Sequence, residues 1–174
     1  ATPQAPVSPP VVTPLNDQAL WRLLRQATWG PTQADFDRLK AVGVDAWIEE
    51  QFAATPSVYP DTLLAQNMEW TEEYFFQLAL TGNDQLRQRV AWALSQIWVV
   101  SGVELVRADA MVPWIRLLQS HAFGNFYDLM RDGTMHPAMG EYLDMVNNKK
   151  SNGTILPNEN FAREILQLFT ICLL

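Results

Sequence analysis

Apolar residues recur at intervals of three and four positions along most of the chain after Pro14, which is the spacing of amphipathic helices. The first such segment follows a capping residue at Asn16 or Asp17. Its apolar positions are Leu20, Leu23, Leu24 and Ala27. They fall on one face of a helix, and we expect that face to be buried.

Polar residues and glycines mark the ends of the next helices. Thr32 and Asp35 have the spacing of a capping box, and Gly43 is expected to end the helix that they begin. Phe36 lies on its core face. Asp45 then opens a third helix, whose apolar residues are Trp47, Ile48 and Phe52.

A loop over residues 54–61 leads to a fourth helix, which we expect over 63–80, with or without a break near Asn67. The polar triplet at 81–83 ends it. The next helix, over 84–101, is apolar on most of its circumference, which indicates a position inside a bundle. Its main stripe and its second apolar side comprise Leu86, Val90, Leu94, Ile97 and Trp98, with Trp92 and Val99.

Shorter helices are expected in the last third of the chain. One carries Trp114, Leu117, Leu118 and His121 on a shared face, and another carries Phe123, Phe126 and Met130 and ends at Asp132-Gly133. Pro137 suits the first position of a further helix, which would have His136 before it and bury Met139, Tyr142, Leu143 and Val146. A polar loop follows over 147–154.

The pattern therefore predicts an all-α fold, a multi-helix bundle of about eight helices, because no strand alternation is visible. Residues 1–15 contain five prolines and read as an extended linker. Residues 16–174 form the all-α domain, which we expect to be the N-terminal part of a larger one. Its last apolar run, ending in FTICLL, has no cap, so a partner protein or a further C-terminal region is expected to cover it.

Charge and composition narrow the function classes. The net charge is −7 and no cationic cluster occurs, which disfavours nucleic-acid binding. Beyond the Pro-rich start, the longest stretch without charge runs from Val90 to Val103, which is too short to cross a bilayer. The single Cys172 lies at helical spacing with Phe169 and is expected to be a buried thiol. The Pro-rich start suggests a segment behind a removed targeting signal, and hence an extracytoplasmic protein, periplasmic, secreted or at the cell surface.

Four stretches resemble a bacterial family catalogued as domain of unknown function 1800. They begin WRLLRQATWG at residue 21, DQLRQRVAW at 84, LLQSHAFGNFYDLM at 117 and PNENFAREILQLFTI at 157, and the likeness extends from about residue 18 to 171. The resemblance implies a bacterial, usually exported protein that is usually longer than this chain, and it implies no particular activity. In the family the last motif continues into Gly, whereas here Cys172 follows Ile171.

The candidate site in PNENFAREILQLFT lies on the polar side of a helix. Glu159 and Glu164 are the candidate acid and base, and Asn158, Asn160 and Arg163 are candidate binding residues. The structural alternative is strong, because Asn158 can cap the helix and Glu159 can pair with Arg163 for roughly 0.2–0.5 kcal/mol. This side has no Lys, however, and favours a hydrogen-bonded network or a site over plain solvent.

The other candidates are single residues. His136 is a further catalytic candidate, although it also suits a helix cap, and His121 suits the edge of a core. Arg87 binds an anion or pairs with Asp84. Trp29 is the tryptophan expected to be exposed. No metal motif, P-loop or nucleophile elbow is present, so the sequence predicts no metal and no cofactor.

Two functions follow as hypotheses. The first is a binding or assembly role at the cell surface or in the periplasm. The second is a hydrolytic or carbohydrate-active enzyme that uses Glu159 and Glu164, with Arg163 and His136 lining its site.

Overall fold

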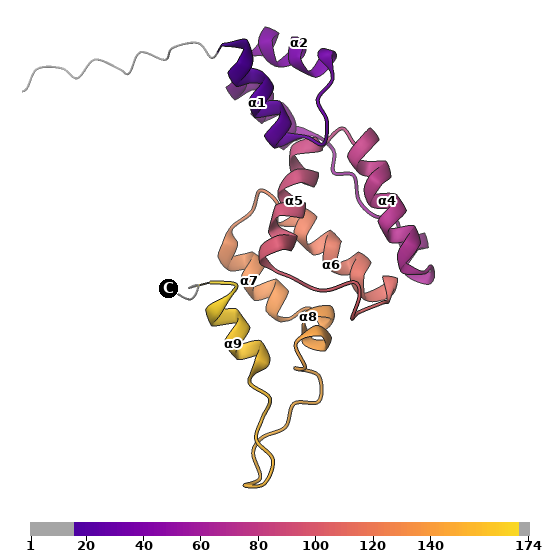
Figure 1. Ribbon diagram of the computed structural model, residues 1–174, viewed down its shortest axis with the longest axis vertical. Helices are drawn as coiled ribbons and strands as arrows, with labels where there is room; N and C mark the ends of the chain where they lie inside the picture. Colours follow the sequence, from indigo (N-terminus) through magenta and orange to yellow (C-terminus); the bar gives the residue numbers. More distant parts are fainter. Residues whose placement is uncertain (1–15, 171–174) are drawn as a thin grey trace, which may run out of the picture.

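The structure is a computed structural model that describes residues 16–170, and this part of the chain is all-α, as predicted. Nine α-helices and one 3₁₀ helix occur among the described residues, and none of these residues lies in a strand (Figure 1). The elements are α1 (Asp17–Ala27), α2 (Gln33–Val42), α3 (Val44–Ala53), the 3₁₀ helix η1 (Asp61–Ala65), α4 (Met68–Thr81), α5 (Gln85–Ile97), α6 (Ala108–Ser120), α7 (Phe126–Thr134), α8 (Pro137–Tyr142) and α9 (Asn160–Gln167).

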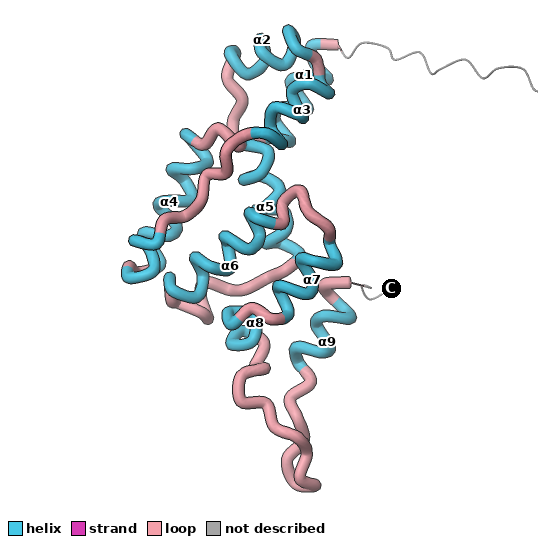
Figure 2. Tube along the Cα trace, turned by 180° about the vertical axis from the view of Figure 1, so that it is seen from behind, coloured by secondary structure: helices cyan, strands magenta, loops and turns pink. Residues whose placement is uncertain are grey.

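Helices α1–α3 form a unit at one end of the molecule (Figures 1 and 2). The predicted capping box is present, since Thr32 Oγ1 accepts from Asp35 N and Asp35 Oδ2 accepts from Thr32 N. Gly43 ends α2 with a φ of 85°, a value that glycine adopts readily. The core of this unit consists of Leu20, Leu24, Ala27, Phe36, Leu39 and Trp47.

The Gln85 side chain joins this unit to the rest of the protein. Its Oε1 accepts from Trp29 N at 3.1 Å, and its Nε2 donates to Ala79 O at 3.1 Å and to Gly82 O at 2.8 Å. Nearby, Gln51 Oε1 accepts from Leu86 N at 3.1 Å. Several hydrogen bonds therefore connect the α1–α3 unit to the beginning of α5.

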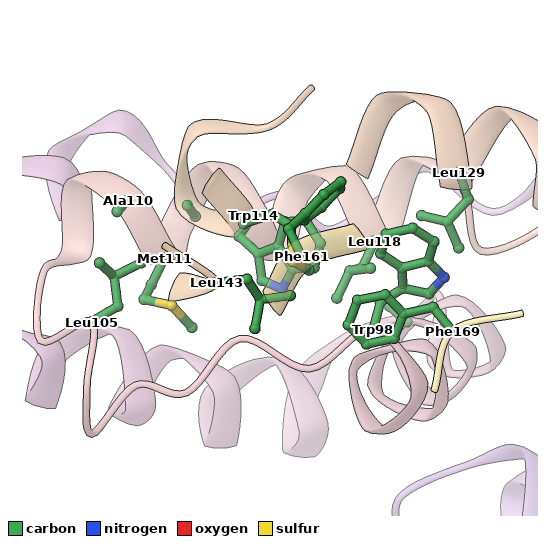
Figure 3. Packing of buried hydrophobic residues seen from close by; sticks show 13 residues of the cluster. Trp98, Leu105, Ala110, Met111, Trp114, Leu118, Leu129, Leu143, Phe161 and Phe169 are labelled. Carbon is green, nitrogen blue, oxygen red and sulfur yellow. The ribbon is translucent and has the colours of Figure 1, made fainter. Parts of the chain in front are cut away.

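The main core lies between α5, α6, α7, α8 and α9, and Figure 3 shows its packing. Trp98 and Trp114 are at most 1% exposed, and the Trp98 ring stacks on Phe169 with centroids 4.7 Å apart. A Cβ on Gly133 would lie 3.1 Å from the Trp98 ring, so a larger residue would push this contact apart. Gly133 is thus an internal packing residue of α7, and the prediction that Asp132-Gly133 ends this helix is wrong.

In the middle of the chain, the structure decides one alternative that the sequence left open and shortens one predicted helix. The expected fourth helix is interrupted, because Asn67 caps α4 by accepting from Trp70 N at 3.4 Å and η1 precedes it. The helix expected over 84–101 ends at Ile97. It is not enclosed, since Trp92 is 40% and Ile97 45% exposed. Of its apolar residues, Ala91 and Trp92 line a cleft between α4, α5 and α6, whereas Ile97 does not.

In the C-terminal third, fewer apolar side chains are buried than the sequence predicted. Helix α8 ends at Tyr142, and a tight turn with Asp144 at a φ of 58° leaves Val146 56% exposed, so its predicted burial is wrong. Helix α9 buries Phe161, and Phe169 beyond its end is also buried. The predicted linker over 1–15 and the predicted burial of Cys172 lie outside the described residues. Within the described residues, no helix combines the length and the apolar character that crossing a bilayer requires.

Candidate functional site

The predicted acid and base on α9 belong to a network around Arg163. This side chain lies 3.7 Å from Glu159 Oε1 and 3.5 Å from Glu164 Oε1, and it donates to Asn160 Oδ1 at 3.1 Å. The Glu159 side chain is 81% exposed, whereas that of Glu164 is 17% exposed. The arrangement matches the ion-pair alternative, and Glu164 is the carboxylate that is shielded from water.

Asn158 and Asn160 have structural partners as well. Asn158 Oδ1 accepts from Asn160 N at 2.8 Å, which places a cap-like contact at the start of α9. Asn148 clamps the same residue, donating from Nδ2 to Asn158 O at 2.7 Å and accepting from Asn158 N at 2.9 Å. These contacts close the long loop between α8 and α9.

His136 caps α8, as its position before Pro137 suggests. Its Nδ1 accepts from Ala138 N at 3.2 Å, and its ring meets Trp114 edge to face with centroids 5.3 Å apart. Burial lowers the pKa of His136, partly opposed by a contact with the Pro113 backbone. Within residues 16–170, His136 forms no hydrogen bond or ion pair with Glu159, Arg163 or Glu164, so direct contacts do not join the predicted catalytic residues.

Arg87 is held from within the protein. Its Nη1 donates to Gln119 O at 3.3 Å, its Nε lies 3.9 Å from Asp84 Oδ2, and its guanidinium covers the Phe123 ring at 4.6 Å. The predicted pairing with Asp84 is therefore present. His121, with a side chain 15% exposed, lies at the core edge and meets Asp132 Oδ2 at 3.0 Å.

The prediction for Trp29 is wrong. Its indole nitrogen is buried, and its ring packs edge to face on Phe75 and Trp92 with centroids 5.2 and 5.4 Å away. Arg89 covers Trp29 at 4.5 Å and Trp92 at 5.0 Å. Phe75 and Trp92 of this aromatic group line a cleft that the sequence did not reveal.

That cleft lies between α4, α5 and α6 and has a volume of about 500 Å³. It is called the interhelical cleft below. Its lining is mainly apolar and includes Tyr59, Phe75, Phe76, Ala91, Trp92, Met111, Trp114 and Leu118. Burial raises the pKa of Tyr59, so this phenol is neutral at ordinary pH. The volume falls in the range of small-molecule sites.

A chain of hydrogen-bonded polar side chains lies beside the interhelical cleft at the beginning of α5. Asp84 is 0% exposed, and its Oδ2 accepts from Ser57 N at 2.9 Å and from Gln88 Nε2 at 3.0 Å. Gln88 Oε1 in turn accepts from Gln119 Nε2 at 2.7 Å. Gln88 and Gln119 line the cleft, and Asp84 lies behind them.

A second hollow lies between α7 and α9 and has a volume of about 560 Å³. It is called the α7–α9 groove below, and its lining is Tyr127, Met130, Arg131, Thr134, Met135, Ile165, Leu166 and Thr170. Met135 is 79% and Leu166 55% exposed. Of the predicted site residues, none lines the groove, and none lines the interhelical cleft.

The sequence reasoning overlooked Gln88 and Gln119, which look like ordinary polar helix residues. A signal was present, because Gln88 stands one turn after Asp84 and Gln119 directly follows the buried Leu118. Among residues 16–170, no group of three or more His, Cys, Asp or Glu side chains is arranged to hold a metal ion.

A protein-family model described as "Protein of unknown function (DUF1800)" matches residues 22–173. No curated protein and no solved structure matches the chain.

Proposed function

Since this chain belongs to the DUF1800 family, whose description assigns no activity, we propose from its surface that it is an extracytoplasmic bacterial protein that assembles with another polypeptide. One observation carries the proposal, the α7–α9 groove with its exposed large apolar side chains. Tyr127 is 65% exposed, Met135 79% and Leu166 55%, and a polypeptide that covers them removes this apolar area from water.

The groove runs between two helices, so an amphipathic helix of the partner is the occupant that fits it best. Arg131 is the charged residue among its lining, and it already has Asp128 and Asp132 as partners. The groove therefore offers apolar contact more than charge, which suits the apolar face of a helix. This agrees with the sequence expectation that a partner covers the last apolar helix.

The extracytoplasmic location rests on the Pro-rich segment before α1 and on the family resemblance. Accessibility to protease in intact bacterial cells, before and after the outer membrane is opened, tests it for the full-length protein. Protection from protease in both conditions would contradict the location.

A photo-crosslinking amino acid tests the assembly. Placed at Met135 of the full-length protein in living cells, it is expected to give one discrete adduct with another polypeptide. Leu166→Glu should abolish this adduct by charging the groove, whereas Leu80→Glu on α4, at a residue 83% exposed outside the groove, should leave it intact. The absence of an adduct from Met135, or equal loss in both variants, would contradict the proposal.

The hydrolytic alternative stays a prediction. Glu164 suits the proton-transfer role better than Glu159, because its side chain is shielded from water. Neither lines one of the two hollows described above, and no specific observation favours this function over assembly.

A further inference from the structure

We infer that the interhelical cleft is a binding site for a small uncharged amphiphile, with an apolar body and a hydroxyl or amide N–H group that donates to Gln119. This inference concerns a different surface from the proposed assembly site, and either can fail alone. It rests on the direction of the hydrogen bonds beside the cleft and on the chemistry of its walls.

The hydrogen bonds fix the orientation of Gln119. Ser57 O and the Asp84 carboxylate are acceptors, so Gln88 must turn its Nε2 toward them, at 3.1 and 3.0 Å. Gln88 Oε1 then faces Gln119 and requires a donor. Gln119 Nε2 supplies it at 2.7 Å and also donates to Ser57 O at 3.2 Å.

This orientation leaves Gln119 Oε1 without a donor. The residue is 3% exposed, and this oxygen has no partner among the described residues. A buried carbonyl without a hydrogen bond is unfavourable, because nothing compensates the loss of its hydration. Because Oε1 can only accept, the missing group must be a donor, and Gln119 is a residue that lines the cleft.

Thr71 is a second orphan in the same cleft. It lies on α4, is 3% exposed, and its Oγ1 has no partner among the described residues. A threonine in a helix usually bonds back to the carbonyl four residues earlier, as Thr81 does to Gln77 O at 2.8 Å. Thr71 makes no such bond, so its hydroxyl offers a second polar point to a ligand.

The walls of the cleft determine the remaining chemistry. Apolar and aromatic side chains dominate them, among them Phe75, Trp92, Trp114 and Leu118, and they suit an aliphatic or aromatic body. No Lys, Arg or His belongs to the lining, whereas Glu72 does, and the Arg89 guanidinium nearest to it is already engaged over Trp29 and Trp92, so the lining disfavours an anionic ligand. A sugar with many hydroxyl groups would leave most of them unpaired. The ligand is therefore neutral with few polar groups.

Two isomers, 1-octanol and heptyl methyl ether, test the donor requirement. They have the same atoms, but only the alcohol can donate. Calorimetric titration of the full chain is expected to show 1-octanol binding about tenfold more tightly, the effect of one hydrogen bond to an otherwise unsatisfied acceptor. Octanoate should bind more weakly than 1-octanol. Equal binding of the two isomers, or no binding by either, would mean that water satisfies Gln119 and would overturn the inference.

Variants locate the site. Gln119→Met alone would leave Gln88 Oε1 without its donor, so it is combined with Gln88→Met. Without either acceptor, the preference for the alcohol over the ether should disappear while the ether still binds. Ser95→Phe places a ring in the cleft and should abolish binding of 1-octanol, whereas Ala93→Phe, on an exposed position of the same helix outside the lining, should not. If the double variant does not fold, the Ser95 and Ala93 pair still decides the location. Equal effects of that pair would overturn it.

Thr71→Val tests whether the second orphan is open to a ligand. The variant removes a hydroxyl that has no partner in the chain, so the free protein should melt at the same temperature or higher. A clearly lower melting temperature would show that the hydroxyl has a partner within the protein and is not a point for ligand binding.

Discussion

The interhelical cleft and the α7–α9 groove have similar volumes, about 500 and 560 Å³, and both are apolar, yet they differ in what surrounds them. The floor of the cleft belongs to the core, since Trp114 and Leu118 are each 1% exposed. Two buried polar atoms without partners belong to cleft-lining residues. Both hollows have exposed apolar side chains at their edges, such as Phe76 in the cleft and Met135 and Leu166 in the groove, but no buried polar atom without a partner belongs to a described residue that lines the groove.

The comparison separates two kinds of recognition. A buried acceptor discriminates strongly between ligands that donate and ligands that do not, because its desolvation is unfavourable unless a donor arrives. Exposed apolar side chains discriminate by shape and area only. We therefore expect chemical selectivity from the cleft and broad apolar contact from the groove. The predictions below test this contrast in order of decreasing effect.

The largest difference in stability loss is expected between a substitution in the floor of the cleft and one in the wall of the groove. Trp114→Ala should lower the free energy of unfolding by about 3–5 kcal/mol, because it leaves a cavity in the main core. Leu166→Ala should change it by less than about 0.5 kcal/mol, as for most exposed positions. Urea unfolding of both variants measures this contrast. Similar losses would show that the groove wall is part of the core.

A smaller loss is expected from the polar chain beside the cleft. Asp84→Asn puts an amide where a carboxylate accepts from Ser57 N and Gln88 Nε2, and it should lower the free energy of unfolding by about 1–3 kcal/mol. It also removes the charge that turns Gln88, so the alcohol preference at Gln119 should weaken. Asp128→Asn, at a partly exposed position of α7, is the control and should leave the preference for alcohol unchanged. A preference for alcohol unchanged in Asp84→Asn would contradict the proposed orientation.

His136, which packs on Trp114 in the floor of the cleft, should make the free energy of unfolding depend on pH. Burial lowers its pKa in the folded protein from the ordinary 6.5, so between the two pKa values the unfolded chain binds more protons. Stability is therefore full above pH 6.5 and falls as the pH drops below that value. His136→Asn keeps an acceptor for the helix cap without titrating there. From pH 7 to pH 5.5 the unaltered protein should lose free energy of unfolding relative to His136→Asn, and a difference between the two that does not change with pH would refute this account.

The smallest effect is expected on α9. Glu159→Gln should change the free energy of unfolding by less than about 0.5 kcal/mol, because its side chain is 81% exposed and its pair with Arg163 is open to solvent. Glu164→Gln should cost more, since this side chain is 17% exposed beside the same arginine. Thermal melts of the two variants measure this difference in stability. A reversed order would mean that the exposed acid has a role that the geometry does not indicate.

Local signals in the sequence predicted most of the fold. The capping box at Thr32, the stop at Gly43 and the His136 cap depend on neighbours within four residues, and all are confirmed. The burial of Trp92 and Val146 was mispredicted, because burial depends on elements that are distant in sequence. Helical spacing shows that a face is apolar, and it does not show whether another helix covers it.

The candidate sites illustrate the same limit more strongly. The polar cluster on α9 is visible in the sequence because its members are consecutive, and the structure places them in a local network. The chain of Asp84, Gln88 and Gln119 joins residues up to 35 positions apart and depends on the carbonyl of Ser57. Only the packing of α5 against α6 brings these groups together. The orphaned acceptor follows from that packing and from no local motif.

The junction around Gln85 has a mechanical consequence. A pulling force applied ahead of α1 reaches α5 through the polar bonds of Gln85 and Gln51 and through Arg89, which donates to Gln26 O at 3.2 Å. Inside α1–α3, by contrast, interlocked apolar side chains resist the load together. Apolar contacts cross the junction as well, because Leu86 packs against the α1–α3 core and the Trp29 ring packs on Phe75 and Trp92. Polar bonds and rings therefore resist the load together, and the three-helix unit should stay docked on α5 at low force.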